Sequence, residues 1–260
     1  MPSQFSFKGV ATALVTPMRQ ADGTVDEGAL RSLVEFQITN GVNGVVPCGT
    51  TGESATLNHA EHHHVMDVVV EQAAGRVPVI IGAGSNSTRE AISLTQHARA
   101  IGANAVLSIA PYYNKPTQEG FYQHYKAITE SVEIPIFVYN VPGRTGSNIT
   151  AETTLRIAEL PGIVGIKEAS GNIQQIMEIL LHRPPHFAVL SGDDALTLPL
   201  MALGADGAIS VVANEAPLLF SSMVRLCLEE KFSEARVVHE ELLNLMSLNF
   251  IESNPIPVKC

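Results

Sequence analysis

The chain has 260 residues, of which 45% are hydrophobic and 16% charged, so it is too apolar for disorder and long enough to bury one large core. Its 16 Lys and Arg against 26 Asp and Glu give a net charge of −10, which argues against nucleic acid or an anionic membrane as a partner. No apolar run approaches the roughly 18 residues of a membrane span, and residues 1–9 lack a signal-peptide pattern. Three cysteines without CxxC spacing are typical of free thiols, so we expect a cytoplasmic protein.

Short apolar runs rich in β-branched residues recur along the chain and predict eight strands. Successive runs begin 20 to 34 residues apart, and each gap holds a segment with helical periodicity, such as 87–101 or 118–130. The predicted strands begin near Val10, Gly44, Pro78, Ala105, Pro135, Ile163, Phe187 and Gly207.

Strands that are apolar on both faces, each followed by a helix, are typical of a parallel sheet covered by helices. Eight such units in about 210 residues favour an α/β fold of the (β/α)8 TIM-barrel type. An open doubly wound sheet remains the alternative, because periodicity alone does not show that the sheet closes.

The ends of several helices are also marked. Asn58 and Glu61 have the spacing of a capping box, and Gly102 is placed to end a helix in the left-handed conformation. Helices are expected over 217–230 and 232–250, before the breaker Asn254-Pro255-Ile256-Pro257. We therefore predict a barrel core over residues 1–215 and C-terminal helices over 216–260, with a helical extension that looks truncated.

In such a barrel, the chemistry is expected where strands end at their C-terminal side. Hydroxyls, one amine and one guanidinium gather at those positions. The segments concerned are 49–53 (GTTGE), 111–114 (PYYN), 139–144 (YNVPGR), Lys167, 191–194 (SGDD) and Ile209.

Lys167 follows the apolar run 162–166 directly, which would place its amine at the dry mouth of the barrel. Loss of water disfavours the ammonium form and leaves a fraction of neutral, nucleophilic amine. Such an amine condenses with a ketone to give a Schiff base. Position alone favours the alternative, a lysine that reaches solvent from a strand end, but the neighbouring residues reverse that preference.

Those neighbours have functional groups that suit a keto acid. Tyr139 would end the adjacent strand, where its phenol could move the proton needed to form and dehydrate a carbinolamine. The Gly49–Gly52 turn offers backbone N–H groups and two hydroxyls to a small carboxylate, and Arg144 offers a two-pronged clamp. Each has a plain structural alternative: ring packing for Tyr139, an ordinary loop for the turn, and a surface salt bridge for Arg144.

Other reactive side chains are interpreted structurally. His59, His62 and His63 share one helical face, but none of the nine histidines falls at a strand end, so no metal site is predicted. Asp193-Asp194 is interpreted as a pair of helix-capping residues. Cys48 lacks a histidine partner at a strand end and is interpreted as a packed thiol.

Six motifs taken together resemble those of the bacterial dihydrodipicolinate synthases, which belong to the pyruvate-dependent class I aldolases. They are GTTGES (49–54), PYYN (111–114), YNVPGRTG (139–146), GIKEA (165–169), SGDD (191–194) and NPIPVK (254–259), in the family's order. The resemblance implies a lyase that condenses pyruvate with L-aspartate 4-semialdehyde to 4-hydroxy-tetrahydrodipicolinate, the entry step of diaminopimelate and lysine biosynthesis. It implies no cofactor and no metal.

The resemblance also implies roles for individual residues. Lys167 matches the Schiff-base lysine, and Tyr139 matches the proton donor. Thr50 matches a relay threonine, and Tyr113 matches a relay tyrosine that crosses the dimer interface into the neighbour's site. The positions matching substrate contacts are Thr51 for the pyruvate carboxylate, Arg144 for the semialdehyde carboxylate, and Gly192 and Ile209 for backbone contacts.

A second set of matches implies feedback inhibition by L-lysine at a cleft in the dimer interface. Glu90 can pair with an ammonium, and Asn86 and Tyr112 can hydrogen-bond polar groups. A solvated helix face is the structural alternative. The matching positions are Ser54, Ala55, His59, His62, Asn86, Glu90 and Tyr112.

The family is commonly a tetramer of tight dimers, so we expect a homo-oligomer, either a dimer or a tetramer. Family chains continue beyond NPIPVK, and a missing helix would weaken assembly. Two other functions remain open: an N-acetylneuraminate or keto-deoxy-sugar-acid lyase, which shares the GxTGE turn and the lysine, and a barrel that binds pyruvate without turnover. Arg144 favours a second substrate that carries a carboxylate near its aldehyde.

Overall fold

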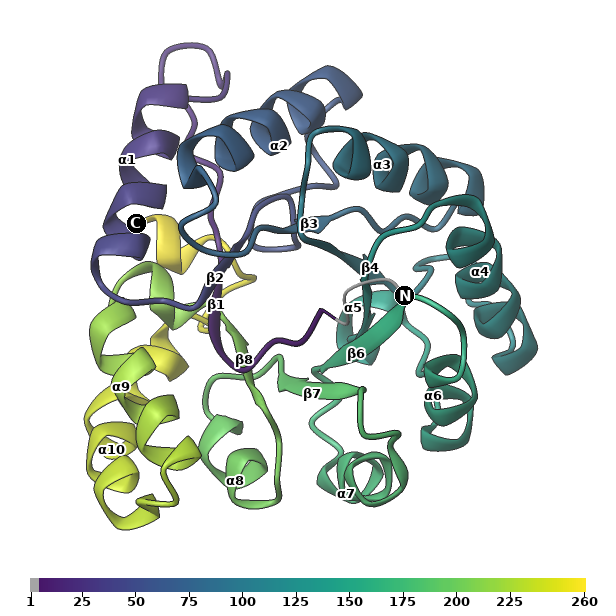
Figure 1. The fold of residues 1–260 in the computed structure, drawn as a ribbon. Helices are drawn as coiled ribbons and strands as arrows, with labels where there is room; N and C mark the ends of the chain where they lie inside the picture. The colour runs from purple at the N-terminus through teal and green to yellow at the C-terminus, as the bar shows by residue number, and fades with distance from the viewer. Residues whose placement is uncertain (1–4) are drawn as a thin grey trace.

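A computed structural model describes residues 5–260, which form a ring of eight parallel strands surrounded by helices (Figure 1). Residues 1–4, part of the segment without a signal-peptide pattern, lie outside that range. Every strand begins within two residues of its predicted start. The strands are β1 Gly9–Ala13, β2 Gly44–Val46, β3 Ile80–Gly82, β4 Ala105–Ile109, β5 Ile136–Asn140, β6 Ile163–Glu168, β7 Ala188–Ser191 and β8 Gly207–Ser210.

The sheet closes on itself, so the predicted barrel is confirmed and the open-sheet alternative is wrong. The strand order is β2-β1-β8-β7-β6-β5-β4-β3. The remaining seam between β2 and β3 is joined by a parallel bridge between Val45 and Val79, with the Val45 amide donating to the Pro78 carbonyl at 3.0 Å. At this seam Gly82 approaches the backbone just after β2 so closely that a Cβ atom there would lie 2.0 Å from the Cys48 carbonyl oxygen.

The helices fall where the apolar periodicity predicted them, with the capping box at Asn58 and Glu61 confirmed in both its hydrogen bonds. Gly102 adopts the predicted positive φ of 83°. The short helix α5 was not predicted. The helices are α1 Glu27–Thr39, α2 His59–Ala73, α3 Thr88–Ala100, α4 Gln118–Ser131, α5 Pro142–Thr145, α6 Ala151–Ala158, α7 Ile173–His182, α8 Thr197–Ala202, α9 Pro217–Leu228 and α10 Phe232–Leu248, with 3-10 turns at Val212–Asn214 and Pro257–Lys259.

Alternation along each strand divides the buried side chains between two cores. In β5, Phe137 and Tyr139 face the barrel interior, whereas Val138 packs into the layer between strands and helices. The interior is filled by residues such as Ala11, Val46, Leu107, Phe137, Leu190 and Ile209. Successive side chains at the end of each strand therefore point alternately into the barrel mouth and under the helices.

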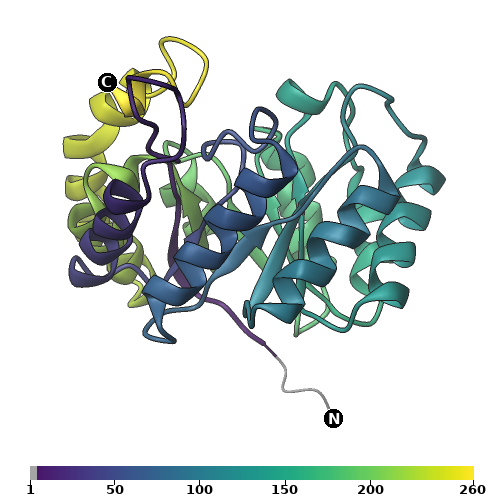
Figure 2. The same cartoon turned by 90° about the horizontal axis from the view of Figure 1, so that it is seen from above.

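The chain's last segment returns to the barrel mouth after α10. Figure 2 shows this segment, in yellow, at the upper end of the barrel in that view. Lys259 Nζ donates to the Thr16 carbonyl at 2.9 Å and pairs with Glu53 in the loop after β2. None of the helices within residues 5–260 combines the length and apolarity needed to cross a bilayer.

One histidine in the helical layer is buried with only one of its two ring nitrogens hydrogen-bonded. His124 on α4 is 5% exposed; its Nδ1 pairs with the Thr88 hydroxyl at 2.9 Å, whereas its Nε2 is buried without a partner. Burial lowers the pKa of His124 to about 4. In the unfolded chain the ring protonates at its ordinary pKa of about 6.5, so the unfolded state binds more protons between those two values. The stability that neutral His124 provides is present above pH 6.5 and is lost as the pH falls toward 4.

We therefore expect His124→Gln, which cannot protonate, to gain about 2 kcal/mol of unfolding free energy relative to wild type when the pH is lowered from 7.5 to 5. Denaturant unfolding of both proteins at the two pH values measures this difference. Thr88→Val, which removes the hydrogen-bond partner but keeps the ring, is the control and should retain the acid sensitivity. A difference that does not change with pH would contradict the prediction.

Candidate active site

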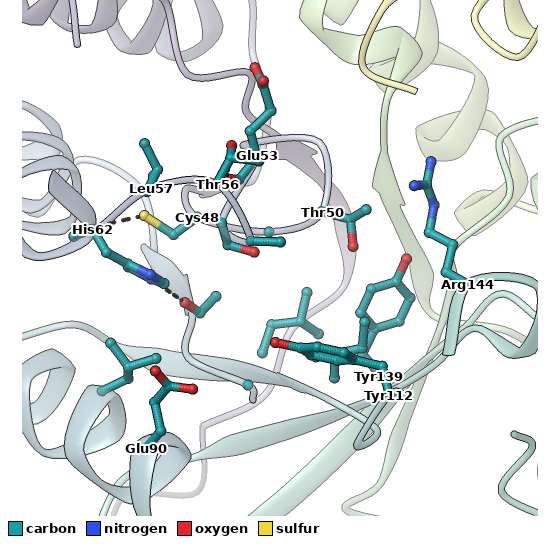
Figure 3. Close-up of a pocket in the computed structure, with 18 of the residues that line it drawn as sticks. Cys48, Thr50, Glu53, Thr56, Leu57, His62, Glu90, Tyr112, Tyr139 and Arg144 are labelled. Carbon is teal, nitrogen blue, oxygen red and sulfur yellow. Dashed lines mark hydrogen bonds between the residues drawn. The ribbon is translucent and has the colours of Figure 1, made fainter. Parts of the chain in front are cut away.

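A cavity of about 560 Å³ opens at the C-terminal ends of the strands (Figure 3). The loops after β2, β3, β4 and β5 form its walls, and the C-terminal segment closes one side through Asn254 and Pro255. Thr50, Tyr139 and Arg144 share this cavity, whereas Lys167 and Thr51, which the sequence placed beside them, do not line it.

Lys167 and Tyr139 lie directly opposite each other on neighbouring strands, because β5 and β6 are in register at these two residues. The Lys167 amine lies 4.5 Å from the centre of the Tyr139 ring, and the two residues are only 5% and 6% exposed. Within residues 5–260 Lys167 forms no ion pair. The alternative in which this lysine reaches solvent is therefore wrong.

Gly192, at the end of β7, leaves the space that the Lys167 side chain occupies. A Cβ atom at Gly192 would lie 2.9 Å from Lys167 Cε and 2.7 Å from Ala169 Cβ. Ile209 lies deeper, fully buried in the barrel interior. Gly192 therefore lies beside Lys167, and Ile209 lies in the core beneath it. Neither residue lines the open cavity.

The next residue of β6, Glu168, points the other way and anchors the strand beneath the helices. It is 1% exposed, and its carboxylate accepts hydrogen bonds from the Asn140 amide at 3.2 Å, the Gln175 amide at 3.3 Å and the Ser170 backbone N–H at 2.8 Å. Burial raises the pKa of Glu168. Asn140 follows Tyr139, and Glu168 follows Lys167. The network therefore holds the ends of β5 and β6, and with them the side chains of Tyr139 and Lys167 on the inner face.

Asp194 corrects one interpretation from the sequence. Asp193 accepts from the Ala195 N–H at 3.0 Å within the turn before α8, and α8 has no side-chain cap, so neither aspartate caps the helix. Asp194 instead accepts from the N–H groups of Val211 and Val212, at 3.0 and 2.8 Å, across the loop that follows β8. Burial raises its pKa to about 6, against those hydrogen bonds and the charge of Lys167, which lower it. The sequence could not show this, because the partners lie 17 and 18 residues away.

The GTTG turn is held in an unusual backbone shape at both ends. Cys48 and Glu53 adopt positive φ values of 56° and 58°, and the Thr16 hydroxyl donates to the Gly52 carbonyl at 2.7 Å. The Cys48 thiol is buried against the His62 carbonyl, and burial raises its pKa, which confirms a packed thiol. Thr50 lines the cavity, whereas Thr51 is 3% exposed and accepts a hydrogen bond from the Asn254 side chain at 2.9 Å.

Arg144 stands on α5 and donates through Nη2 to the Asn254 backbone carbonyl at 2.9 Å. Within residues 5–260 no carboxylate pairs with it, so the salt-bridge alternative is wrong. Its charge is available to an anion in the cavity. No sequence pattern identified Asn254 as a site residue: it was marked only as part of a helix breaker and of the NPIPVK motif.

Tyr113 is placed differently from the other residues with predicted catalytic roles. It has a positive φ of 71°, is 89% exposed and does not line the cavity. Within one copy of the chain, Tyr113 is therefore not assembled with Lys167, Tyr139 and Thr50.

Most residues predicted to bind lysine line the same cavity. His62 and Glu90 lie on its far side from Arg144, whereas Tyr112 lies beside Tyr139 (Figure 3). His59 lies 3.2 Å from Glu90, and the His62 ring bonds the Gly82 carbonyl at 2.9 Å. Burial lowers the pKa of His62. The members that line the cavity are Ser54, Ala55, His59, His62, Glu90 and Tyr112. Asn86 does not line it; its carbonyl accepts from the Asn114 amide at 3.0 Å.

The three histidines that share one face of α2 point to different partners. His63 stacks on His97 with 4.0 Å between ring centres, whereas His59 meets Glu90 and His62 meets β3. Among the described residues, no three side chains of metal-binding type converge.

Known proteins with this fold and these motifs are close in sequence. The chain is 56% identical over 252 residues to the 4-hydroxy-tetrahydrodipicolinate synthase of Chloroherpeton thalassium, covering 96% of this chain and 83% of that protein. Its structure matches a dihydrodipicolinate synthase from Acinetobacter baumannii complexed with pyruvate, with a TM-score of 0.95 and 48% identity over 97% of this chain and 86% of that one. A lysine-bound dihydrodipicolinate synthase from Cyanidioschyzon merolae gives a TM-score of 0.94 at 42% identity, with the same coverages.

The model of the dihydrodipicolinate synthetase family matches residues 6–260, which is nearly the whole chain. The fold match and the identity of 56% over 96% of this chain agree with it. The chain therefore belongs to the dihydrodipicolinate synthetase family.

Proposed function

We propose that this chain condenses pyruvate with L-aspartate 4-semialdehyde to 4-hydroxy-tetrahydrodipicolinate through a Schiff base on Lys167. Family membership makes it a lyase; the substrates and the residue roles are the proposal. The observation that carries it is the buried Lys167 amine, unpaired within residues 5–260 and 4.5 Å from the ring centre of Tyr139, in a protein whose structural neighbour was crystallised with pyruvate.

The first stage joins the amine to pyruvate. Neutral Lys167 attacks the ketone carbon, and the resulting carbinolamine loses water to give a protonated imine. Tyr139 donates the proton that lets hydroxide leave as water, and Thr50 passes protons between that phenol and the next member of the relay. Burial of both Lys167 and Tyr139 keeps bulk water from competing for these protons.

Tyr113 enters the relay from a second copy of the chain. Its side chain is almost fully exposed and does not line its own cavity, so a relay that includes it needs a dimer in which it reaches the neighbour's Thr50. The positive φ of 71° sets this residue out from the loop after β4. We accordingly propose a homo-oligomer built on at least a dimer.

The second stage forms the carbon–carbon bond. The protonated imine makes the pyruvate methyl group acidic, and loss of a methyl proton gives an enamine whose carbon attacks the aldehyde carbon. The aldehyde oxygen takes up a proton in the same stage and becomes the hydroxyl group of the adduct. Arg144 orients the aldehyde by pairing with its carboxylate. The amino group of the adduct then attacks the imine carbon, which releases the Lys167 amine and closes the ring. One water leaves overall.

Borohydride with pyruvate should trap one reduced pyruvate on Lys167, because hydride reduces the imine to a stable secondary amine. Intact mass followed by peptide mapping measures the adduct. Lys167→Ala should give none, whereas Lys126→Ala, which removes a partly exposed lysine of α4, should give the full adduct. An unmodified wild-type chain after this treatment would rule out the Schiff-base mechanism.

Removing the guanidinium should impair the second substrate selectively. Arg144→Ala is expected to raise the KM for aspartate semialdehyde by about tenfold to a hundredfold, the range for a lost hydrogen bond to a charged group. The KM for pyruvate and the borohydride adduct should change little. Steady-state kinetics with each substrate varied in turn measures this, and Arg156→Ala, which removes an exposed arginine paired with Glu119, is the control.

The same kinetics separate the alternative functions. Preference of the wild-type enzyme for N-acetylmannosamine over aspartate semialdehyde would replace the proposal with a sugar-acid lyase. An adduct with pyruvate but no turnover of either aldehyde would indicate a pyruvate-binding barrel without catalysis.

We further propose that L-lysine inhibits the enzyme at the side of the cavity formed by His59, His62 and Glu90. The Glu90 carboxylate offers a partner for an ammonium group, and the structural neighbour from Cyanidioschyzon merolae holds lysine. Because this region and Tyr139 line one continuous cavity, a ligand in it can alter the catalytic side without a long-range change of the fold.

Glu90→Gln should raise the lysine concentration for half-inhibition by about tenfold or more, since it removes a charge-assisted pair. Initial rates during a lysine titration of both proteins measure it. Glu71→Gln on the exposed side of α2 is the matched control and should keep the wild-type response. A wild-type rate that stays constant over the titration would contradict feedback inhibition.

A further inference from the structure

Asn254 connects the two substrate-binding groups of the cavity from the far end of the chain. Its side-chain amide donates to the Thr51 hydroxyl oxygen at 2.9 Å, and its backbone carbonyl accepts from Arg144 Nη2, also at 2.9 Å. The residue is 6% exposed and lines the cavity beside Pro255. A segment more than 100 residues from Arg144 and 200 from Thr51 thus contacts both.

The direction of the hydrogen bond to Thr51 has a chemical consequence. A threonine hydroxyl has one proton to donate and two lone pairs that accept. Here Asn254 Nδ2 donates to one lone pair, and within the described residues the Thr51 proton has no acceptor of its own. The hydroxyl is therefore held as a donor, oriented and polarised, in a residue that is 3% exposed.

The other half of the Asn254 amide indicates that the contact is kept for more than stability. Asn254 Oδ1 is buried without a hydrogen-bond partner, an arrangement that costs folding free energy and that an apolar side chain would avoid. Asn254 is the donor that Thr51 requires; an aspartate would instead accept the Thr51 proton and would add a negative charge beside an anion.

We infer that Asn254 is a positioning residue that turns the Thr51 hydroxyl proton toward the carboxylate of the keto acid, while its carbonyl steadies Arg144 for the second carboxylate. This inference rests on the proposed function. It assigns the two contacts to different atoms: the side chain serves the keto-acid site, and the backbone serves the aldehyde site.

That separation makes the inference testable by side-chain substitution alone. Asn254→Ala removes the donor to Thr51 but keeps the carbonyl that Arg144 uses. We expect the KM for pyruvate to rise about tenfold, the effect of one hydrogen bond, while the KM for aspartate semialdehyde stays within about twofold. Asn254→Asp should raise the KM for pyruvate further, because it reverses the hydrogen bond and repels the carboxylate. Borohydride at saturating pyruvate should still label Lys167 in both variants.

Asn249→Ala is the matched control for a loosened C-terminal segment. Asn249 is 2% exposed and holds the same segment through a 2.6 Å hydrogen bond to Glu215, away from the cavity. The Asn249→Ala variant should have a lower melting temperature than the wild type and an unchanged KM for pyruvate. In a Thr51→Val background, Asn254→Ala should have no further effect on that KM, because its effect passes through Thr51.

Equal increases in both KM values for Asn254→Ala would overturn the inference, and so would the same pyruvate effect in Asn249→Ala. An unchanged KM for pyruvate in Asn254→Ala, with normal adduct in the wild type, overturns the positioning role alone. Absence of the adduct in the wild type overturns the proposed function instead, so the two failures are distinguishable. If Asn254→Ala does not fold, the comparison of Asn254→Asp with wild type still decides the direction of the hydrogen bond.

Discussion

The pairing of β5 with β6 is the constraint on which the site depends. Tyr139 stands opposite Lys167, and the following pair, Asn140 and Glu168, points to the other side of the sheet. Because side chains alternate along a strand, one register places a phenol and an amine together inside the barrel and an amide and a carboxylate together outside it. If β6 were shifted by one residue against β5, Glu168 would take the place of Lys167 and leave a charged carboxylate in the barrel mouth.

The buried pair Asn140 and Glu168 helps to hold Tyr139 and Lys167 in place, because breaking its hydrogen bonds costs free energy. A carboxylate buried under α7 is tolerated only while the Asn140, Ser170 and Gln175 donors reach it. A rotation of the end of β6 would leave those groups unpaired, so the network penalises any movement that would take Lys167 away from Tyr139. The amine can therefore hold one position without a direct ion pair inside the described chain.

The cavity above this pair gathers groups from distant parts of the chain. The GTTG turn, the loop after β5 and the C-terminal segment meet through Thr51, Arg144 and Asn254, and the region around His59 and Glu90 opens into the same space. The proposed chemistry and the proposed response to lysine thus share one cavity. Tyr113 is the exception, because it does not line the cavity of its own chain. The proposed relay therefore requires a second copy of the chain.

Sequence alone determined the eight strands, most helices and the end of the barrel that carries function, because alternation, apolar periodicity and capping residues are local properties of neighbouring positions. It also predicted that Lys167 and Tyr139 would be neighbours, since each ends a strand of consecutive units. Tertiary structure alone decided the closure at Val45 and Val79, the bonds of Asp194 to the loop after β8, and the contacts of Asn254. Those interactions join residues 17 to more than 200 positions apart, and their geometry follows from how the closed ring packs, which no local pattern encodes.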